Sequence, residues 1–157
     1  MRFMPIEKRI AILFIKKEMT LGIAESCTGG LVSHRLTNIP GSSHFLKVGI
    51  IAYSNEAKKR LLGVKAHLLR NFGAVSAEVA QAMAKGIQNK FKCDFGIGIT
   101  GIAGPTGATQ TKPVGLVYIA ASCGTKTIIK KFLLKGNRLS VKSQAATNAL
   151  KLLLKLL

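Results

Sequence analysis

Apolar residues recur along the chain with two different spacings, and the spacing predicts the element at each place. Ile6, Ile10, Leu13 and Phe14 follow one another at helical intervals, so residues 6–18 are expected to form a helix. Apolar runs that lack this period predict strands at 20–25, 45–53, 95–100, 114–123 and 125–134. The last two runs flank Gly124, and we expect them to form a hairpin.

Further helices are predicted between and after these runs. They are expected from Gly29 to the break at Pro40-Gly41, over Asn55–Leu62, over a turn or two at 65–72, from the N-cap Ser76 through Phe91, and over 138–156. Helices alternate with the early strands and a hairpin comes late, which predicts an α/β fold: a three-layer α/β/α single domain around a mixed β-sheet. Because no linker is rich enough in Pro, Gly or Ser to divide the chain, one domain is expected over residues 1–157.

Composition and charge narrow the classes of protein. Three cysteines without a CxxC spacing make a disulfide framework improbable and indicate the reducing cytoplasm. No uncharged apolar stretch is long enough for a membrane span, so no membrane association is expected. The net charge of +18 is able to attract nucleic acid or a phosphorylated small molecule. Because the basic residues are scattered, a solvated surface explains much of that charge.

Metal and cofactor chemistry is not expected. The three histidines form no HxH or HExxH pattern, and the few carboxylates outside the first helix do not sit at ligand spacing. Hydroxyl, thiol, lysine and arginine side chains remain as the groups that can carry chemistry.

The stretch AESCTGG, residues 24–30, places three small nucleophilic side chains between a strand and a helix. Backbone N–H groups gather at such a junction, and Gly29 and Gly30 let a substrate come close to the backbone. The stretch is therefore a candidate for a nucleophile beside an anion cradle. The alternative is that Ser26 and Thr28 only cap the following helix. Alternation along the chain predicts that the Cys27 side chain points away from Ser26 into the core.

The stretch AYSNEAKKR, residues 52–60, offers a base for such a nucleophile. Tyr53 ends a predicted strand, and Lys58 lies on the helix that follows. A lysine acts as a general base only when burial or nearby positive charge keeps it neutral near pH 7. The alternative is that Lys58 is one more exposed lysine.

Two further stretches are candidates for ligand binding. TGIAGPTG, residues 100–107, ends a predicted strand, and the glycines at 101, 104 and 107 with Pro105 predict a rigid loop whose backbone amides are able to line a ligand. Arg138 follows Gly136-Asn137 at the start of the last helix and is able to hold a phosphate or carboxylate through two N–H groups. A glycine-rich turn without a ligand is the alternative for the first stretch.

Together these stretches resemble the C-terminal domain of the CinA family, which includes nicotinamide-nucleotide amidase. The resemblance covers roughly residues 5–155. It is carried by AESCTGG, PGSS at 40–43, AYSNEAK at 52–58, LLGV at 61–64, GAVS at 73–76, GIAGPTG at 101–107 and KPVG at 112–115. It implies a metal-free amidohydrolase that converts nicotinamide mononucleotide to nicotinic acid mononucleotide and ammonia. A homodimer is also implied by the resemblance.

The resemblance also implies roles for individual residues. Ser26 would be the nucleophile, Lys58 its base, and Tyr53 a member of the same hydrogen-bond network. Thr28 and the amides of Gly29 and Gly30 would hold substrate or oxyanion. Substrate-binding positions would further include Thr100, Gly101, Gly104 and Arg138, with Arg138 meeting an anionic group such as the phosphate.

The chain departs from the family pattern at three positions. Ala108 stands where a further glycine is usual, Asn137 replaces an aspartate before the arginine, and Lys142 replaces a second arginine. These changes bear on phosphate binding, because a lysine cannot form a bidentate fork. The alternative function is a catalytically impaired CinA-like binding protein that associates with nucleic acid through its basic surface and serves competence.

Overall fold

The computed structural model describes residues 4–157, which form helices and strands. In chain order these are α1 (Ile6–Lys16), β1 (Leu21–Glu25), α2 (Leu31–Thr37), the 3-10 turn η1 (Ser42–His44), β2 (Leu46–Ile51), α3 (Asn55–Leu62), α4 (Ala66–Phe72), α5 (Ala77–Lys90), β3 (Phe95–Gly101), β4 (Leu116–Cys123), β5 (Lys126–Leu133) and α6 (Arg138–Leu156). The predicted strands all form, each within about two residues of its expected ends.

The five strands form one mixed sheet in the order β2-β1-β3-β4-β5. β1 pairs in parallel with both β2 and β3, whereas β4 runs antiparallel to β3 and to β5. The predicted hairpin at Gly124 is therefore confirmed. Because β1, β2 and β3 are parallel, their carboxyl ends meet at one edge of the sheet, where the loops after Glu25, Ile51 and Gly101 begin.

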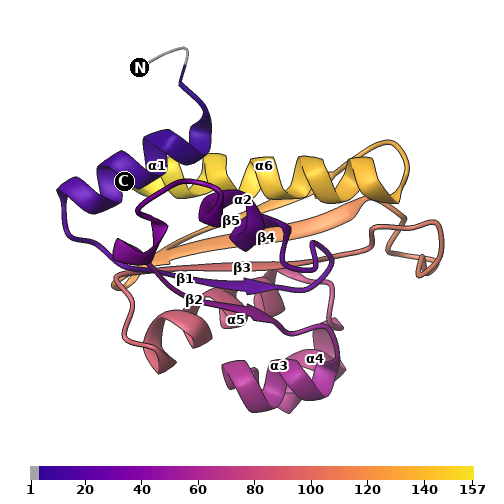
Figure 1. The fold of residues 1–157 in the computed structure, drawn as a ribbon. Coiled ribbons are helices and arrows are strands. Elements are labelled where there is room, and N and C mark those ends of the chain that lie inside the picture. The colour runs from indigo at the N-terminus through magenta and orange to yellow at the C-terminus, as the bar shows by residue number, and fades with distance from the viewer. Residues whose placement is uncertain (1–3) are drawn as a thin grey trace.

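Helices cover both faces of the sheet, which confirms the three-layer α/β/α fold. In Figure 1, α1, α2 and α6 lie on one face, and α3, α4 and α5 lie on the other. α5 lies very close to the sheet because Gly98 has no side chain: a Cβ there would stand 2.3 Å from the carbonyl oxygen of Ala80. Within residues 4–157, no helix has the length and apolar character needed to cross a membrane.

The second helix begins two residues later than the sequence predicts. α2 starts at Leu31, because Gly29 and Gly30 adopt positive φ angles of 61° and 96° that an α-helix cannot contain. The two glycines instead turn the chain sharply between β1 and α2. This turn leaves Ser26 at the carboxyl edge of the sheet.

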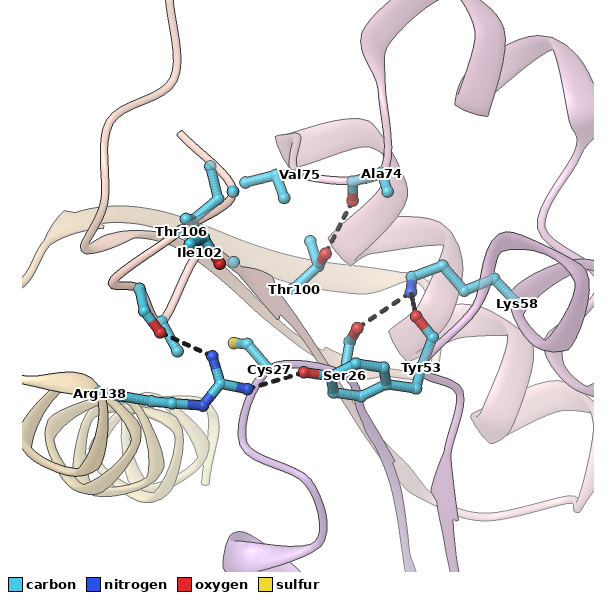
Figure 2. A pocket seen from close by; sticks show the side chains of 14 residues that line it. Ser26, Cys27, Tyr53, Lys58, Ala74, Val75, Thr100, Ile102, Thr106 and Arg138 are labelled. Carbon is cyan, nitrogen blue, oxygen red and sulfur yellow. Dashed lines mark hydrogen bonds between the residues drawn. The ribbon is translucent and has the colours of Figure 1, made fainter. Parts of the chain in front are cut away.

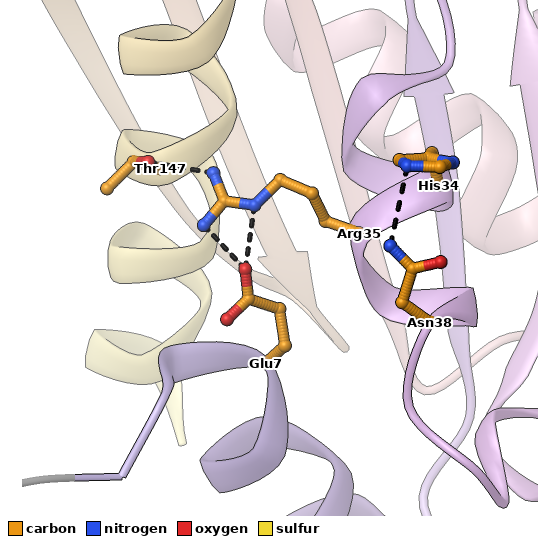
Figure 3. Close-up of polar contacts among 5 residues, drawn as sticks. All are labelled: Glu7, His34, Arg35, Asn38 and Thr147. Atoms are coloured by element: carbon orange, nitrogen blue, oxygen red, sulfur yellow. Dashed lines mark hydrogen bonds and ion pairs between the residues drawn. The ribbon is translucent and has the colours of Figure 1, made fainter.

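A polar contact joins the three helices on the α6 side of the sheet. Arg35 on α2 donates hydrogen bonds to Glu7 on α1, with Nε–Oε1 at 2.7 Å, and to the hydroxyl of Thr147 on α6, also at 2.7 Å (Figure 3). The same Glu7 oxygen lies 2.6 Å from Nη2 of Arg35, and both side chains are partly buried. One guanidinium therefore holds three separate elements together.

Replacing Arg35 with alanine is expected to lower the free energy of unfolding by about 1–2 kcal/mol, because Glu7 and Thr147 lose a partly buried, charged donor. Chemical denaturation measures the change. Arg60→Ala is the control, because Arg60 is exposed and its closest approach to Glu56 is 3.7 Å. Equal losses in the two variants would show that Arg35 contributes no more than a surface charge.

Candidate active site

A pocket of about 330 Å³ opens at the carboxyl edge of the sheet. Its walls come from the end of β1, the β2–α3 connection, the loop before α5, the loop after β3 and the first residue of α6 (Figure 2). Seven of the predicted site residues line it: Ser26, Tyr53, Lys58, Thr100, Gly101, Gly104 and Arg138. Thr28, Gly29 and Gly30 lie outside its lining.

Ser26 and Lys58 are in direct contact in the pocket. Lys58 Nζ lies 3.0 Å from the Ser26 hydroxyl oxygen and donates to the backbone carbonyls of Ala52 at 2.8 Å and Tyr53 at 3.2 Å. Carbonyl oxygens only accept, so they hold two N–H groups of the amine. When Lys58 is neutral, its lone pair is left to accept the Ser26 proton.

The local sequence explains why this lysine is buried. The Ser54 side chain caps α3 by accepting from the amide of Ala57 at 3.0 Å, and Gly63 ends the helix with a φ of 70°. Between these ends, Lys58 and Leu62 lie one turn apart on the buried face of α3. Lys58 is 1% exposed, which excludes the interpretation that it is one more surface lysine.

Burial shifts the pKa values of two neighbouring titratable groups, the Lys58 amine and the Cys27 thiol. It lowers the pKa of Lys58 below the ordinary lysine value, which favours the neutral amine. A thiolate at Cys27 would oppose this shift, but burial raises the pKa of Cys27 to about 12 and keeps the thiol neutral near pH 7. Cys27 is buried in the core, as predicted, but it also lines the same pocket as Ser26, so the expectation that it turns away from Ser26 is not borne out. Its neutral thiol is a poor nucleophile beside Ser26.

Glu25 is a buried residue of the site region that the sequence reasoning missed. Its carboxylate accepts from the amides of Gly30 and Val32 at 3.1 Å, and from the amide and hydroxyl of Ser33 at 2.9 Å. The carboxylate thus caps α2 from the end of β1. The available signal was a glutamate that ends a buried strand directly before the turn.

This cap corrects the expectation that Gly29 and Gly30 present free amides to a ligand. The amide of Gly30 donates a hydrogen bond to the Glu25 carboxylate, and the amide of Gly29 donates one to the carbonyl of Ser26 at 3.0 Å. The alternative that Ser26 and Thr28 cap α2 is also corrected, because Glu25 is the residue that caps this helix. Thr28 is 1% exposed, and its hydroxyl has no hydrogen-bond partner among the residues that the structure describes.

The opposite wall of the pocket comes from the loop after β3. Thr100 is buried and donates its hydroxyl proton to the carbonyl of Ala74 at 2.8 Å, which joins this loop to the segment before α5. Gly104 has a φ of 83°, and a Cβ there would lie 2.4 Å from a methyl group of Val114. Ala74 and Val75 also line the pocket; they belong to the GAVS segment at 73–76 that carries the family resemblance, but the sequence assigned them no role in the site.

Arg138 lies at the pocket mouth on the first turn of α6. Its guanidinium donates to the carbonyl of Gly104 at 2.7 Å and to the hydroxyl of Tyr53 at 2.9 Å. Asn137 does not orient it, because the Asn137 side chain caps α6 by accepting from the amide of Ser140. Lys142, one turn later, lies beside Gly29. Arg138 and Lys142 therefore add positive charge beside the turn after β1.

Other groups contribute little to the chemistry that this pocket offers. Across residues 4–157, the structure places no three His, Cys, Asp or Glu side chains together as a metal site would require. No carboxylate is among the side chains that line the pocket. Lys58 and Arg138 are the only basic residues among them. Hence the described site combines a hydroxyl, an amine and a guanidinium.

Known proteins are similar to this chain in both sequence and structure. The CinA C-terminal domain family matches residues 4–157. A CinA-like protein of Kosmotoga olearia is 50% identical over 145 residues, which are 92% of this chain and 35% of that protein. A relative from Moorella thermoacetica, named as competence-damage inducible, is 47% identical over 94% of this chain and 36% of its own. The chain thus spans about a third of the curated relatives it matches.

Solved structures agree with this assignment. The competence/damage inducible protein CihA from Agrobacterium tumefaciens has a TM-score of 0.93 at 36% identity, covering 96% of this chain and 93% of that one. A CinA superfamily protein from Escherichia coli also has a TM-score of 0.93, at 30% identity, covering 97% of this chain and 88% of that one. The chain belongs to the CinA family, as a CinA C-terminal domain.

Proposed function

We propose that the protein is an amidohydrolase that converts nicotinamide mononucleotide to nicotinic acid mononucleotide and ammonia, with Ser26 as nucleophile. The observation that carries this proposal is the buried contact of 3.0 Å between Lys58 Nζ and the Ser26 hydroxyl. A lysine that is held neutral by burial is an established way to activate a serine without histidine. The family resemblance supports the carboxamide substrate.

The reaction proceeds in two halves. Ser26 Oγ attacks the carboxamide carbon while the Lys58 amine accepts the hydroxyl proton, which gives a tetrahedral intermediate. The C–N bond then breaks, the Lys58 ammonium returns the proton to the leaving nitrogen, and ammonia departs from an ester on Ser26. In the second half, water attacks this ester and Lys58 accepts its proton. The acid product leaves and Ser26 regains its proton from Lys58.

The pocket also supports an anionic substrate. Lys58 and Arg138 are the two basic side chains in its lining, and no carboxylate lies there. Lys58 already forms hydrogen bonds with Ser26 and two backbone carbonyls. The Arg138 guanidinium is therefore the basic group that is left to bind the substrate's phosphate. Its planar group of donors suits phosphate geometry. A volume of about 330 Å³ is at the lower end of the range for small-molecule pockets.

Release of ammonia from nicotinamide mononucleotide by the purified protein tests the proposed function. The assay includes a chelator and is repeated with nicotinamide riboside and free nicotinamide. We expect turnover of the mononucleotide to exceed that of both comparators. No turnover of any amide by the folded protein would refute the amidase proposal.

The rate is expected to rise with pH through the pKa of Lys58. Because only the neutral amine accepts the Ser26 proton, kcat/KM should fall as the pH drops below that pKa. Burial lowers the pKa, so the rising limb should lie below about 10.4, the ordinary lysine value. A pH–rate profile measures it, and Cys27→Ser should leave its midpoint unchanged. A limb at the ordinary value, or one that disappears in Cys27→Ser, would contradict the role of Lys58.

The alternative function, nucleic-acid binding, would draw on the +18 charge. A single dense basic face would favour it, whereas an even spread favours the enzyme. Exposed lysines lie on α1, β2, α3, α5, β5 and α6, which belong to all three layers of the fold. This distribution supports the amidase as the leading proposal.

A further inference from the structure

Tyr53 makes two separate contacts, and they lead to different parts of the site. Its backbone carbonyl accepts from Lys58 Nζ at 3.2 Å, while its hydroxyl lies 2.9 Å from Nη2 of Arg138 (Figure 2). The hydroxyl is therefore bonded to the guanidinium at the pocket mouth. Lys58 is bonded to Tyr53 through the backbone, a contact that any residue at this position can make.

Arg138 is fixed from two sides of the pocket. Nη1 donates to the carbonyl of Gly104, from the loop after β3, and Nη2 contacts the Tyr53 hydroxyl, from the connection after β2. A planar guanidinium that is bonded at both terminal nitrogens cannot rotate without losing one bond. A guanidinium has five N–H groups, so three remain for a ligand. Their direction is set by the two existing contacts.

We propose that Tyr53 is a positioning residue for Arg138, and that it determines specificity for substrates that carry an anionic group. The tyrosine hydroxyl holds the guanidinium so that its remaining N–H groups meet the substrate's phosphate. Tyr53 thus influences the reaction through Arg138 and not through the Ser26–Lys58 pair. This inference rests on the proposed function only in taking a phosphate-bearing amide as the substrate.

The surroundings of Tyr53 favour this role. The side chain is 59% exposed, whereas Ser26 and Lys58 are 8% and 1% exposed. The hydroxyl thus belongs to the open mouth of the pocket, where a charged group enters, and not to its buried end. The three hydrogen-bond positions of the Lys58 nitrogen are already filled by Ser26, Ala52 and the Tyr53 carbonyl. No position on that nitrogen is left for the tyrosine hydroxyl.

A double-mutant cycle on two substrates separates the two roles. Tyr53→Phe, Arg138→Ala and the double variant are assayed with nicotinamide mononucleotide and with nicotinamide riboside, which lacks the phosphate. We expect Tyr53→Phe to lower kcat/KM for the mononucleotide by about tenfold, as loss of one hydrogen bond does, and for the riboside by less than about twofold. In the Arg138→Ala background, Tyr53→Phe should cause no further loss. Equal losses on both substrates, or losses that add to those of Arg138→Ala, would overturn the proposal.

Binding of inorganic phosphate tests the same idea without turnover. Titration followed by nuclear magnetic resonance should give weaker phosphate binding in Tyr53→Phe and Arg138→Ala than in the wild-type protein. Tyr118→Phe is the matched control, because Tyr118 is the other tyrosine of the chain and lies outside the pocket lining. Weaker binding in Tyr53→Phe supports the positioning role even if no amide is hydrolysed. Unchanged binding in Tyr53→Phe overturns it even if the amidase is active.

Discussion

Replacing Lys58 with methionine is expected to lower kcat for ammonia release from nicotinamide mononucleotide by about 10²- to 10⁴-fold, the range that a general base contributes. Methionine fills a similar volume but cannot accept the Ser26 proton. The 3.0 Å contact and the lowered pKa of Lys58 are the physical reasons for this expectation. Initial-rate measurements of released ammonia check it.

Lys59→Met is the matched control for this variant. Lys59 is the next residue of α3, but it is exposed and forms an ion pair with Glu56 at 2.7 Å. It should retain nearly the full rate of the wild-type protein. A Lys58→Met variant that folds and keeps a rate close to that of Lys59→Met would remove Lys58 from the mechanism.

Replacing Glu25 with alanine is expected to lower the free energy of unfolding by about 3 kcal/mol or more. Three amides and one hydroxyl lose a buried carboxylate acceptor together, and each hydrogen bond to a charged group contributes roughly 1.5–3 kcal/mol. For a chain of this length, such a loss lowers the melting temperature by roughly 6–12 °C. Differential scanning calorimetry measures both quantities.

Two further variants sharpen this prediction. Glu25→Gln keeps one carbonyl oxygen as an acceptor. It should lower the free energy of unfolding by less than Glu25→Ala does, because only part of the cap is lost. Glu56→Ala is the control for removal of a carboxylate at the surface, since the Glu56 side chain is 60% exposed. A melting temperature that changes no more in Glu25→Ala than in Glu56→Ala would show that the cap is not needed for the fold.

The sequence predicted the fold well because its elements are marked locally. The helical spacing in α5, the glycine between β4 and β5 and the cap at Ser76 each depend on a few adjacent residues. The sequence also selected Ser26, Lys58 and Arg138, because their segments carry recognisable motifs. These side chains then meet through the parallel strands that bring their loops to one edge.

What the sequence could not reveal depends on contacts between distant residues. Glu25 caps a helix that begins six residues later, across a turn whose two glycines have positive φ angles. The contact of Tyr53 with Arg138 spans 85 positions, and no periodic pattern encodes it. Burial of Lys58 likewise follows from how α3 packs in the folded chain. Each of these facts required the folded arrangement.

The measurement that tests the central claim most directly is ammonia release from nicotinamide mononucleotide by the wild-type protein and by Ser26→Ala, assayed side by side. The account predicts turnover in the wild-type protein and a loss to the background rate in Ser26→Ala, with the melting temperature retained. Ser43→Ala is the control, because Ser43 is an exposed serine outside the pocket lining. Turnover that persists in Ser26→Ala would contradict the account, because the carboxamide would then be cleaved without its proposed nucleophile.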